Sequence, residues 1–170
     1  MCIRDSSYSH TFQIEASYNI LPDLNFSAAY RLTDVKANYG DGMRQKPLTS
    51  RNKGLLTLGW TPDMGLWQLD ITCALNGSGR NPDPYTTADG TLSWEKRYHP
   101  YAQLNAQLTR NFRHWSIYVG GENLTGYRQK RPIIDASDPW GPNFDATMVH
   151  APIHGAMIYA GFRYNFTQYL

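Results

Sequence analysis

The sequence predicts an all-β protein, an antiparallel up-and-down transmembrane β-barrel or a fragment of one, and two observations carry this prediction. Apolar and polar residues alternate over stretches of about 9 to 11 residues, which is the length of a tilted membrane-spanning strand. Short turns and long polar loops follow these stretches in alternation. No apolar run reaches the roughly 18 residues that a membrane helix needs.

The first two predicted strands form a hairpin. Residues 8–20 place apolar side chains at every second position from Phe12 to Ile20, with polar residues between them. Residues 24–33 repeat the pattern, and the turn Leu21-Pro22-Asp23 joins the two strands. A polar, glycine-bearing loop over residues 34–50 is predicted to follow.

Five more strands are predicted along the rest of the chain. Residues 51–61 and 66–76 are joined by a short turn that begins at Pro62, and residues 100–109 and 115–122 by a turn within R-N-F-R-H. Residues 155–166 form the last strand, in which Ile158, Ala160 and Phe162 share one face. Long polar segments over residues 77–99 and 123–152 separate these hairpins, so the sequence predicts seven strands.

Large aromatic residues lie close to the short turns and to the chain end, as in the aromatic girdle of a membrane interface. These are Tyr18, Trp60, Trp67, Trp115 and Phe166. The short turns of bacterial barrels are periplasmic, so the long loops are predicted to be extracellular. Seven strands would leave two unpaired edges in hydrocarbon, where each unsatisfied backbone group costs several kcal/mol. We therefore expect these strands to belong to a larger barrel.

The first residues and the composition bear on the bounds of the domain and on the classes of partner. Residues 1–7 read M-C-I-R-D-S-S and are interpreted as a non-native leader, which leaves residues 8–170 as one barrel domain whose true N-terminus lies upstream. The formal net charge is +2 and the basic residues are scattered, which predicts no nucleic-acid partner. Cys2 and Cys73 provide neither a disulfide framework nor a metal pair.

The C-terminal part carries a family resemblance. Residues 121–125 read G-E-N-L-T and resemble a G-x-E-N-L-[FT] motif, and an aromatic strand closes the chain. Together they resemble the C-terminal end of TonB-dependent outer-membrane receptors, most of all those of Bacteroidetes. The resemblance implies a barrel of about 22 strands with an N-terminal plug upstream of this chain. It also implies TonB-driven import of a scarce, large nutrient such as a ferric siderophore, haem, cobalamin or a glycan.

The same resemblance implies several partners. They are the lipid and lipopolysaccharide of a Gram-negative outer membrane, the TonB complex and the machinery that assembles barrels. That machinery reads a terminal aromatic residue, whereas Thr167-Gln168-Tyr169-Leu170 follow Phe166 here. Either Tyr169 serves as the assembly signal or the last strand is longer than residues 155–166.

Candidate ligand contacts lie in the predicted extracellular loops, where charged side chains flank aromatic ones. This mixture suits an anionic chelate or a sugar, although a solvated or lipopolysaccharide-facing loop has the same composition. The candidates are Trp94, Tyr98, Tyr127, Arg128, Arg131, Asp135 and Trp140. For the first two, a place in the upper aromatic girdle is an equal alternative.

The sequence predicts neither a metal site nor a catalytic site. The cluster of Met148, His150, His154 and Met157 offers soft ligands, but Pro152 interrupts the spacing, so loop packing is preferred and no metal or cofactor is predicted. Three carboxylates fall on the polar faces of strands without a nucleophile beside them, so no enzyme is predicted. They are Glu15, Asp70 and Glu122.

Three alternatives remain open at this stage. A small eight-stranded barrel with a structural or adhesion role would need one more strand and a signal sequence. A barrel-embedded hydrolase or acyltransferase would need a convergent acid, base and nucleophile. A soluble β-sandwich would not need apolar residues on an exposed face of every strand.

Overall fold

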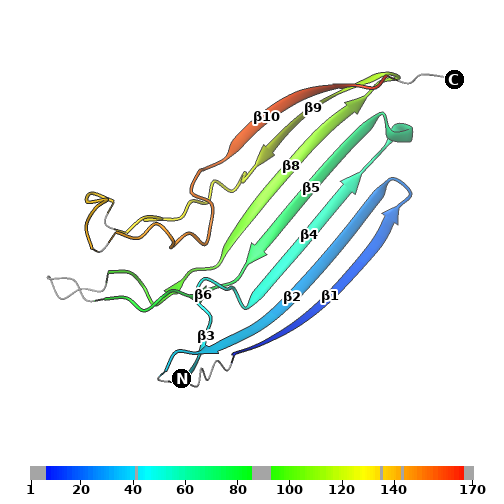
Figure 1. Cartoon of the computed structure of the whole chain (residues 1–170). Coiled ribbons are helices and arrows are strands. Elements are labelled where there is room, and N and C mark those ends of the chain that lie inside the picture. Colours follow the sequence, from blue (N-terminus) through cyan, green and yellow to red (C-terminus); the bar gives the residue numbers. More distant parts are fainter. Residues whose placement is uncertain (1–6, 41, 86–92, 135, 143, 167–170) are drawn as a thin grey trace.

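The computed structural model describes residues 7–40, 42–85, 93–134, 136–142 and 144–166. Within these residues, seven long strands form one antiparallel sheet in which each strand pairs with the next long strand of the chain (Figure 1). In the order of the sheet they are β1 (Ser7–Leu21), β2 (Leu24–Asn38), β4 (Asn52–Trp60), β5 (Trp67–Asn76), β8 (Tyr101–Asn111), β9 (Trp115–Glu122) and β10 (Met157–Tyr164). The predicted all-β, antiparallel up-and-down fold is confirmed, and the sheet is open.

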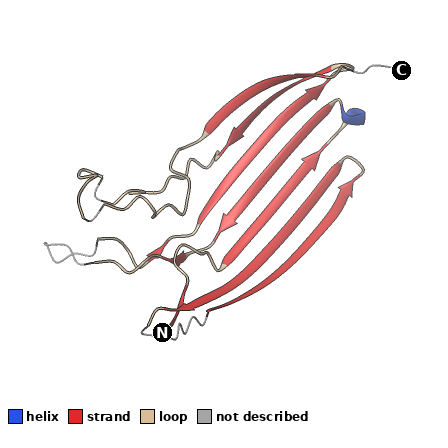
Figure 2. Ribbon diagram, in the orientation of Figure 1, coloured by secondary structure: helices blue, strands red, loops and turns tan. Residues whose placement is uncertain are grey.

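The shorter elements belong to the connections between long strands. β3 (Met43–Gln45) pairs with the end of β2, while β6 (Gly79–Arg80) and β7 (Arg97–Tyr98) form a separate two-stranded ribbon. A single helical turn, η1 (Asp63–Gly65), joins β4 to β5 and is the helical element drawn in Figure 2. In the described part of the chain, no helix has the length and apolar character needed to span a membrane.

The register of the strands confirms that the predicted apolar positions form one continuous face. Trp60 pairs with Leu69, Leu69 with Leu108, Leu108 with Val119, and Val119 with Ala160, which makes one row across five strands. Directly paired residues of neighbouring strands project to the same side of a sheet. Leu108, at the middle of this row, is 37% exposed, and Val119 beside it is 48% exposed. The apolar face is therefore not covered by any other described part of the chain.

The end of the second strand differs from its predicted position. The sequence predicts a loop from residue 34, but β2 continues to Asn38 and pairs with β1 as far as Ser7, opposite Ala37. Asp34 and Lys36, near its end, project to the same side of the strand as the apolar residues before them. A strand that extends beyond a membrane no longer needs apolar residues on that face, so the alternation of hydrophobicity stops before the strand does. The last strand is shorter than predicted, since β10 covers Met157–Tyr164.

The buried apolar residues lie in the long loops and not in the sheet. Among the described residues, the hydrophobic side chains that are buried are Tyr98, Ile134, Met148 and Ala151. Tyr98 ends the short β7, and the other three follow β9 in the long connection to β10. A single sheet cannot bury either of its faces by itself, so the loops make the small core of this chain.

Candidate functional site

The three long loops leave the same end of the sheet, opposite the short turns (Figure 1). We call residues 39–51 the first loop, residues 77–100 the second loop and residues 123–156 the third loop. The second and third loops extend beyond the sheet next to each other in this view, and the short turns lie at the far end. This arrangement is the one expected from the alternation of short turns and long loops in the sequence.

Asn123 anchors both ends of the third loop. It is 3% exposed, and its side-chain amide donates to the carbonyl of Tyr127 at 2.8 Å and to that of His154 at 3.0 Å. Its φ of 50° lies in the left-handed region, which asparagine tolerates better than most residues. The backbone N–H of Asn123 also donates to Oδ1 of Asn105 at 2.9 Å, on the polar face of β8. The asparagine of the G-E-N-L-T motif is therefore a structural clamp.

Gln129 performs a similar task farther out in the third loop. Its amide nitrogen donates to the carbonyl of Met148 at 2.6 Å, and its amide oxygen accepts from the backbone N–H groups of His150 and Ala151. The backbone N–H of Gln129 donates to the carbonyl of Pro152 at 2.8 Å. One buried side chain thus ties the outgoing and returning segments of the loop together.

Tyr98 is the point at which the loops meet. Its ring is 6% exposed and stacks on the imidazole of His150 in the third loop, with 4.1 Å between ring centroids. The same ring lies against Gly79 so closely that a Cβ atom would not fit there. Burial raises the pKa of the Tyr98 hydroxyl, and the hydroxyl of Ser50 beside it opposes that rise. The first, second and third loops are therefore packed together around one ring.

A second stacked pair attaches the third loop to the polar face of the sheet. Tyr101, the first residue of β8, stacks on Tyr127 with 4.8 Å between ring centroids, and its hydroxyl donates to the carbonyl of His150 at 2.8 Å. In the register of the sheet, Tyr101 falls on the same side as Asn105, the polar side. The third loop therefore reaches over the side of the sheet that would face the lumen of a barrel.

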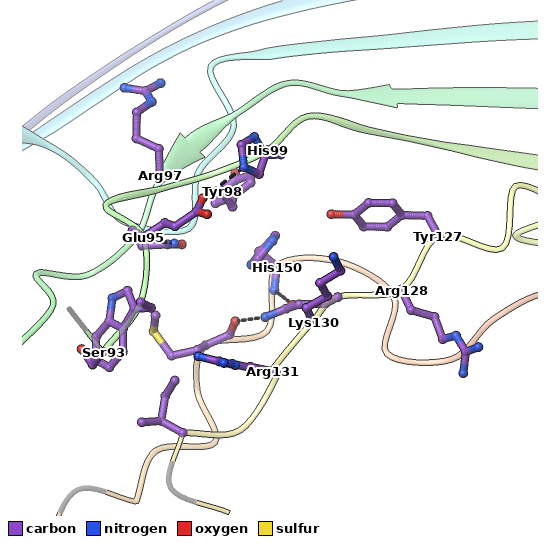
Figure 3. Close-up of a pocket in the computed structure, with 15 residues that line it drawn as sticks. Ser93, Glu95, Arg97, Tyr98, His99, Tyr127, Arg128, Lys130, Arg131 and His150 are labelled. Atoms are coloured by element: carbon purple, nitrogen blue, oxygen red, sulfur yellow. Dashed lines mark hydrogen bonds and ion pairs between the residues drawn. The ribbon is translucent and has the colours of Figure 1, made fainter. Parts of the chain in front are cut away.

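These contacts enclose a hollow of 680 Å³ between the second and third loops. Three aromatic side chains and four cationic ones line it, and Figure 3 shows Arg97 and Arg128 on opposite sides of it. The lining residues of these two kinds are Trp94, Tyr98, Tyr127, Arg97, Arg128, Lys130 and Arg131. Glu95 is the carboxylate of the lining, and it pairs with His99 at 3.1 Å. The hollow therefore carries a net positive charge.

Two further polar side chains, those of Asn81 and His150, line this hollow. Oδ1 of Asn81 is buried and has no hydrogen-bond partner among the described residues, so a donor group entering the hollow would satisfy it. Burial lowers the pKa of the His150 imidazole, which keeps it neutral against the Tyr98 ring at neutral pH. The arrangement suits recognition of an anion with flat or hydroxylated parts, and no nucleophile is hydrogen-bonded to a base among the described lining residues.

Five of the predicted ligand contacts come together here. Trp94, Tyr98, Tyr127, Arg128 and Arg131 all line the hollow, although the predicted contact with a ligand stays a prediction. Trp140 is 96% exposed and does not line it, and Asp135 lies outside the described residues. Of the lining cations, Arg97 and Lys130 were not among the predicted contacts, although each lies next to a predicted residue in the sequence.

Two of the residues considered for metal binding, Met148 and His150, line the hollow, while the carboxylates considered for catalysis lie on the sheet. Across the residues that the structure describes, no three His, Cys, Asp or Glu side chains gather as a metal site would require. Glu15 lies on β1, Asp70 on β5 and Glu122 at the end of β9, so three different strands carry these carboxylates. The Asp70 carboxylate accepts a hydrogen bond from Gln68 at 2.7 Å. Residues 1–6 of the predicted leader and the predicted assembly signal at Tyr169 lie outside the described residues, whereas Ser7, the last residue of the predicted leader, begins β1.

Comparisons with known proteins give a structural match. No family model matches the sequence, and no curated protein matches it. The fold is similar to that of the ferric-catecholate import receptor Fiu from E. coli K12 in its closed form, with a TM-score of 0.64 and 15% sequence identity. This chain shares its fold with part of an import receptor. The match covers 93% of this chain and 21% of the receptor chain, so the chain spans about a fifth of that length.

Proposed function

We propose that this chain is part of the barrel wall and of the external vestibule of an outer-membrane import receptor of the TonB-dependent kind. The observation that carries the proposal is the combination of a one-sided sheet with a positively charged, aromatic hollow at its long-loop end. The apolar face would contact lipid and the polar face would line the lumen. The similarity of the fold to part of Fiu supports the same assignment.

The edges of the sheet support the idea of a larger barrel. β1 and β10 are the outermost strands and each pairs with one long neighbour only. In hydrocarbon their free backbone groups require partner strands. Further strands of the same receptor would supply them, together with a plug and the segment that contacts the TonB complex. The barrel assembly machinery and the lipids of the outer membrane would be the remaining partners.

The hollow favours a large anionic nutrient. Arginine binds carboxylates and the oxygen atoms of chelates through paired hydrogen bonds, and aromatic rings stack on flat groups. A ferric-catecholate complex combines negative charge with aromatic rings, and the similar structure is that of a ferric-catecholate import receptor. We therefore choose such a complex as the first probe, with haem, cobalamin and an acidic glycan as the alternatives.

Uptake kinetics in cells that produce the full-length receptor test this proposal. In the doubly substituted variant Arg128→Gln/Arg131→Gln we expect the concentration for half-maximal uptake of a ferric-catecholate complex to rise about tenfold or more, because charged hydrogen bonds are lost. Arg113→Gln, in a short turn at the far end of the sheet, is the matched control and should leave uptake unchanged. Unchanged kinetics in the double variant for every ligand of the panel would contradict the vestibule role.

A loop exchange provides an independent test of the same role. Replacement of residues 126–152 by an unrelated loop should alter uptake and leave insertion into the membrane intact, because the exchanged residues follow Asn123 and precede β10. The alternative of a small eight-stranded barrel would need one further strand between β1 and β10, and it has less support, since the fold is similar to part of a much longer receptor chain.

A further inference from the structure

We propose that Arg110, together with the rings of Trp67 and Phe112, forms a binding site for the phosphate group of a membrane glycerophospholipid. The site lies on the apolar face of the sheet, beside the short turns, and is distinct from the hollow among the long loops. It rests on the proposed function in one respect, namely that the apolar face contacts a membrane.

The register places Arg110 on the apolar face. Arg110 pairs with Trp67 of β5 on one side and with Ile117 of β9 on the other, and directly paired residues share a face. Two positions earlier along β8 lies Leu108, another member of the apolar row. A cation therefore stands where the neighbouring strands present apolar side chains.

The guanidinium is held by aromatic rings. Its central carbon lies 4.4 Å from the centroid of the Trp67 ring and 5.4 Å from that of Phe112. The Phe112 ring is itself stacked on Trp115 at 3.8 Å, which fixes its orientation. An arginine whose guanidinium lies over a ring interacts with it through its charge, so its N–H groups stay available to donate to a second group.

The charge of Arg110 has no counter-ion in the described part of the chain. No carboxylate lies within ion-pair distance of it, and no hydrogen bond from its guanidinium is found among the described residues. At the opposite end of the sheet, by contrast, Arg44 and Arg80 both pair with Asp83. A cation on a lipid-facing surface is costly unless an anion accompanies it, so an anion from outside the chain is expected at Arg110.

The position along the strand selects the source of that anion. Arg110 lies next to the last residue of β8, and the turn that follows contains Arg113 and His114. This is the level of the lipid headgroups on the short-turn side, where the aromatic girdle also lies. Glycerophospholipids occupy that leaflet of an outer membrane, so their phosphate is the occupant, with acyl chains along Ile117 and Leu108.

Native mass spectrometry of the full-length receptor in detergent, titrated with phosphatidylglycerol, tests the site. In Arg110→Gln we expect the amount of retained phosphatidylglycerol to fall about fivefold, which corresponds to the attraction of one basic residue for an anionic lipid surface. Trp67→Leu keeps the apolar surface, removes the ring under the guanidinium and should reduce retention in the same direction. Arg163→Gln is the control, because Arg163 lies at the same end of the sheet on the opposite face.

The outcomes separate this inference from the proposed function. Equal retention in Arg110→Gln and the unchanged protein, or an equal loss in Arg163→Gln, would overturn the lipid site. A loss of retained lipopolysaccharide in place of phosphatidylglycerol in Arg110→Gln would also overturn it, because the site would then take the lipid of the other leaflet. Failure of the receptor to enter membranes at all would contradict the proposed function instead, and membrane insertion of each variant is measured in parallel.

Discussion

At the scale of single residues, a few side chains hold the loops in place, because each of them contacts two separate segments of the chain. Asn123 explains why the G-E-N-L-T motif needs an asparagine, since its amide binds both ends of the third loop while its backbone adopts a left-handed conformation. His150 stood out in the sequence as a candidate metal ligand. In the structure it packs against Tyr98, in agreement with the preferred interpretation of loop packing.

The stacked imidazole leads to a prediction about pH. Burial lowers the pKa of His150, so an unpacked loop takes up the proton more readily than the packed loop does. The stability of the packed loop is therefore complete above the ordinary histidine pKa of about 6.5 and falls as the pH drops below it, until the lowered pKa is passed. We expect protease cleavage of the third loop to accelerate between pH 7.5 and pH 5 (a range around about 6.5).

His150→Phe is the matched variant for this measurement. Phenylalanine keeps a ring against Tyr98 but cannot take up a proton. Any pH dependence of cleavage that remains in this variant is therefore due to the activity of the protease itself. Parallel pH profiles for the variant and the unchanged protein would show that His150 does not control the packing.

At the scale of elements, the hairpin of β9 and β10 is braced by two tyrosines on its polar face. Tyr159 is paired with Gly120, and Tyr118 with Gly161, and each ring lies over the glycine opposite to it. A Cβ atom on either glycine would collide with the ring. The hydroxyl of Tyr159 also donates to Gln107 on β8 at 3.1 Å, which joins the hairpin to its neighbour.

Substitution of one of these glycines tests the brace. Gly161→Ala should displace the Tyr118 ring and lower the free energy of unfolding by about 1–3 kcal/mol, the usual effect of overpacking. Urea unfolding of the full-length receptor in detergent measures this change. Gly59→Ala is the control, because a Cβ atom there would meet only Oδ1 of Asp70 at 3.8 Å. Equal effects at both sites would show that the tyrosine contact is not responsible.

The long strands were predictable from the sequence because each carries the period-two alternation that its membrane face requires. The predicted range 115–122 matches β9, and β4 lies within the predicted range 51–61. The short strands β3, β6 and β7 were not predictable in this way. They have two or three residues each and lie within the loops, which is too short for an alternation of hydrophobicity to mark them.

At the scale of the whole molecule, the two free edges decide whether this stretch is independent. β1 has only β2 beside it and β10 only β9. We expect residues 7–166, refolded alone in detergent, to give no compact species on an unheated gel, since free edges in an apolar medium favour association with other chains. A monomeric species that migrates faster before heating than after it would contradict this expectation.

The candidate site was predictable in composition and not in shape. Aromatic and charged residues in the second and third loops were identifiable from the sequence, but their meeting depends on contacts between distant segments, such as the stack of Tyr98 on His150. Trp140 is an aromatic residue of the same loop and was predicted together with them, yet it remains outside the hollow. The spacing of residues within each loop does not indicate how two loops pack against each other.

The long strands differ in length from one side of the sheet to the other. β1 and β2 have 15 residues each, whereas β9 and β10 have 8. At about 3.3 Å per residue and a tilt of about 40°, the first pair rises roughly 38 Å and the second only about 20 Å. An apolar band of about 25 Å would be crossed in full by the first pair, whose ends would stand above it, whereas the last pair would leave its upper edge to the third loop that follows β9. In a barrel of this kind, strands would form the rim on one side and packed loops would form it on the other.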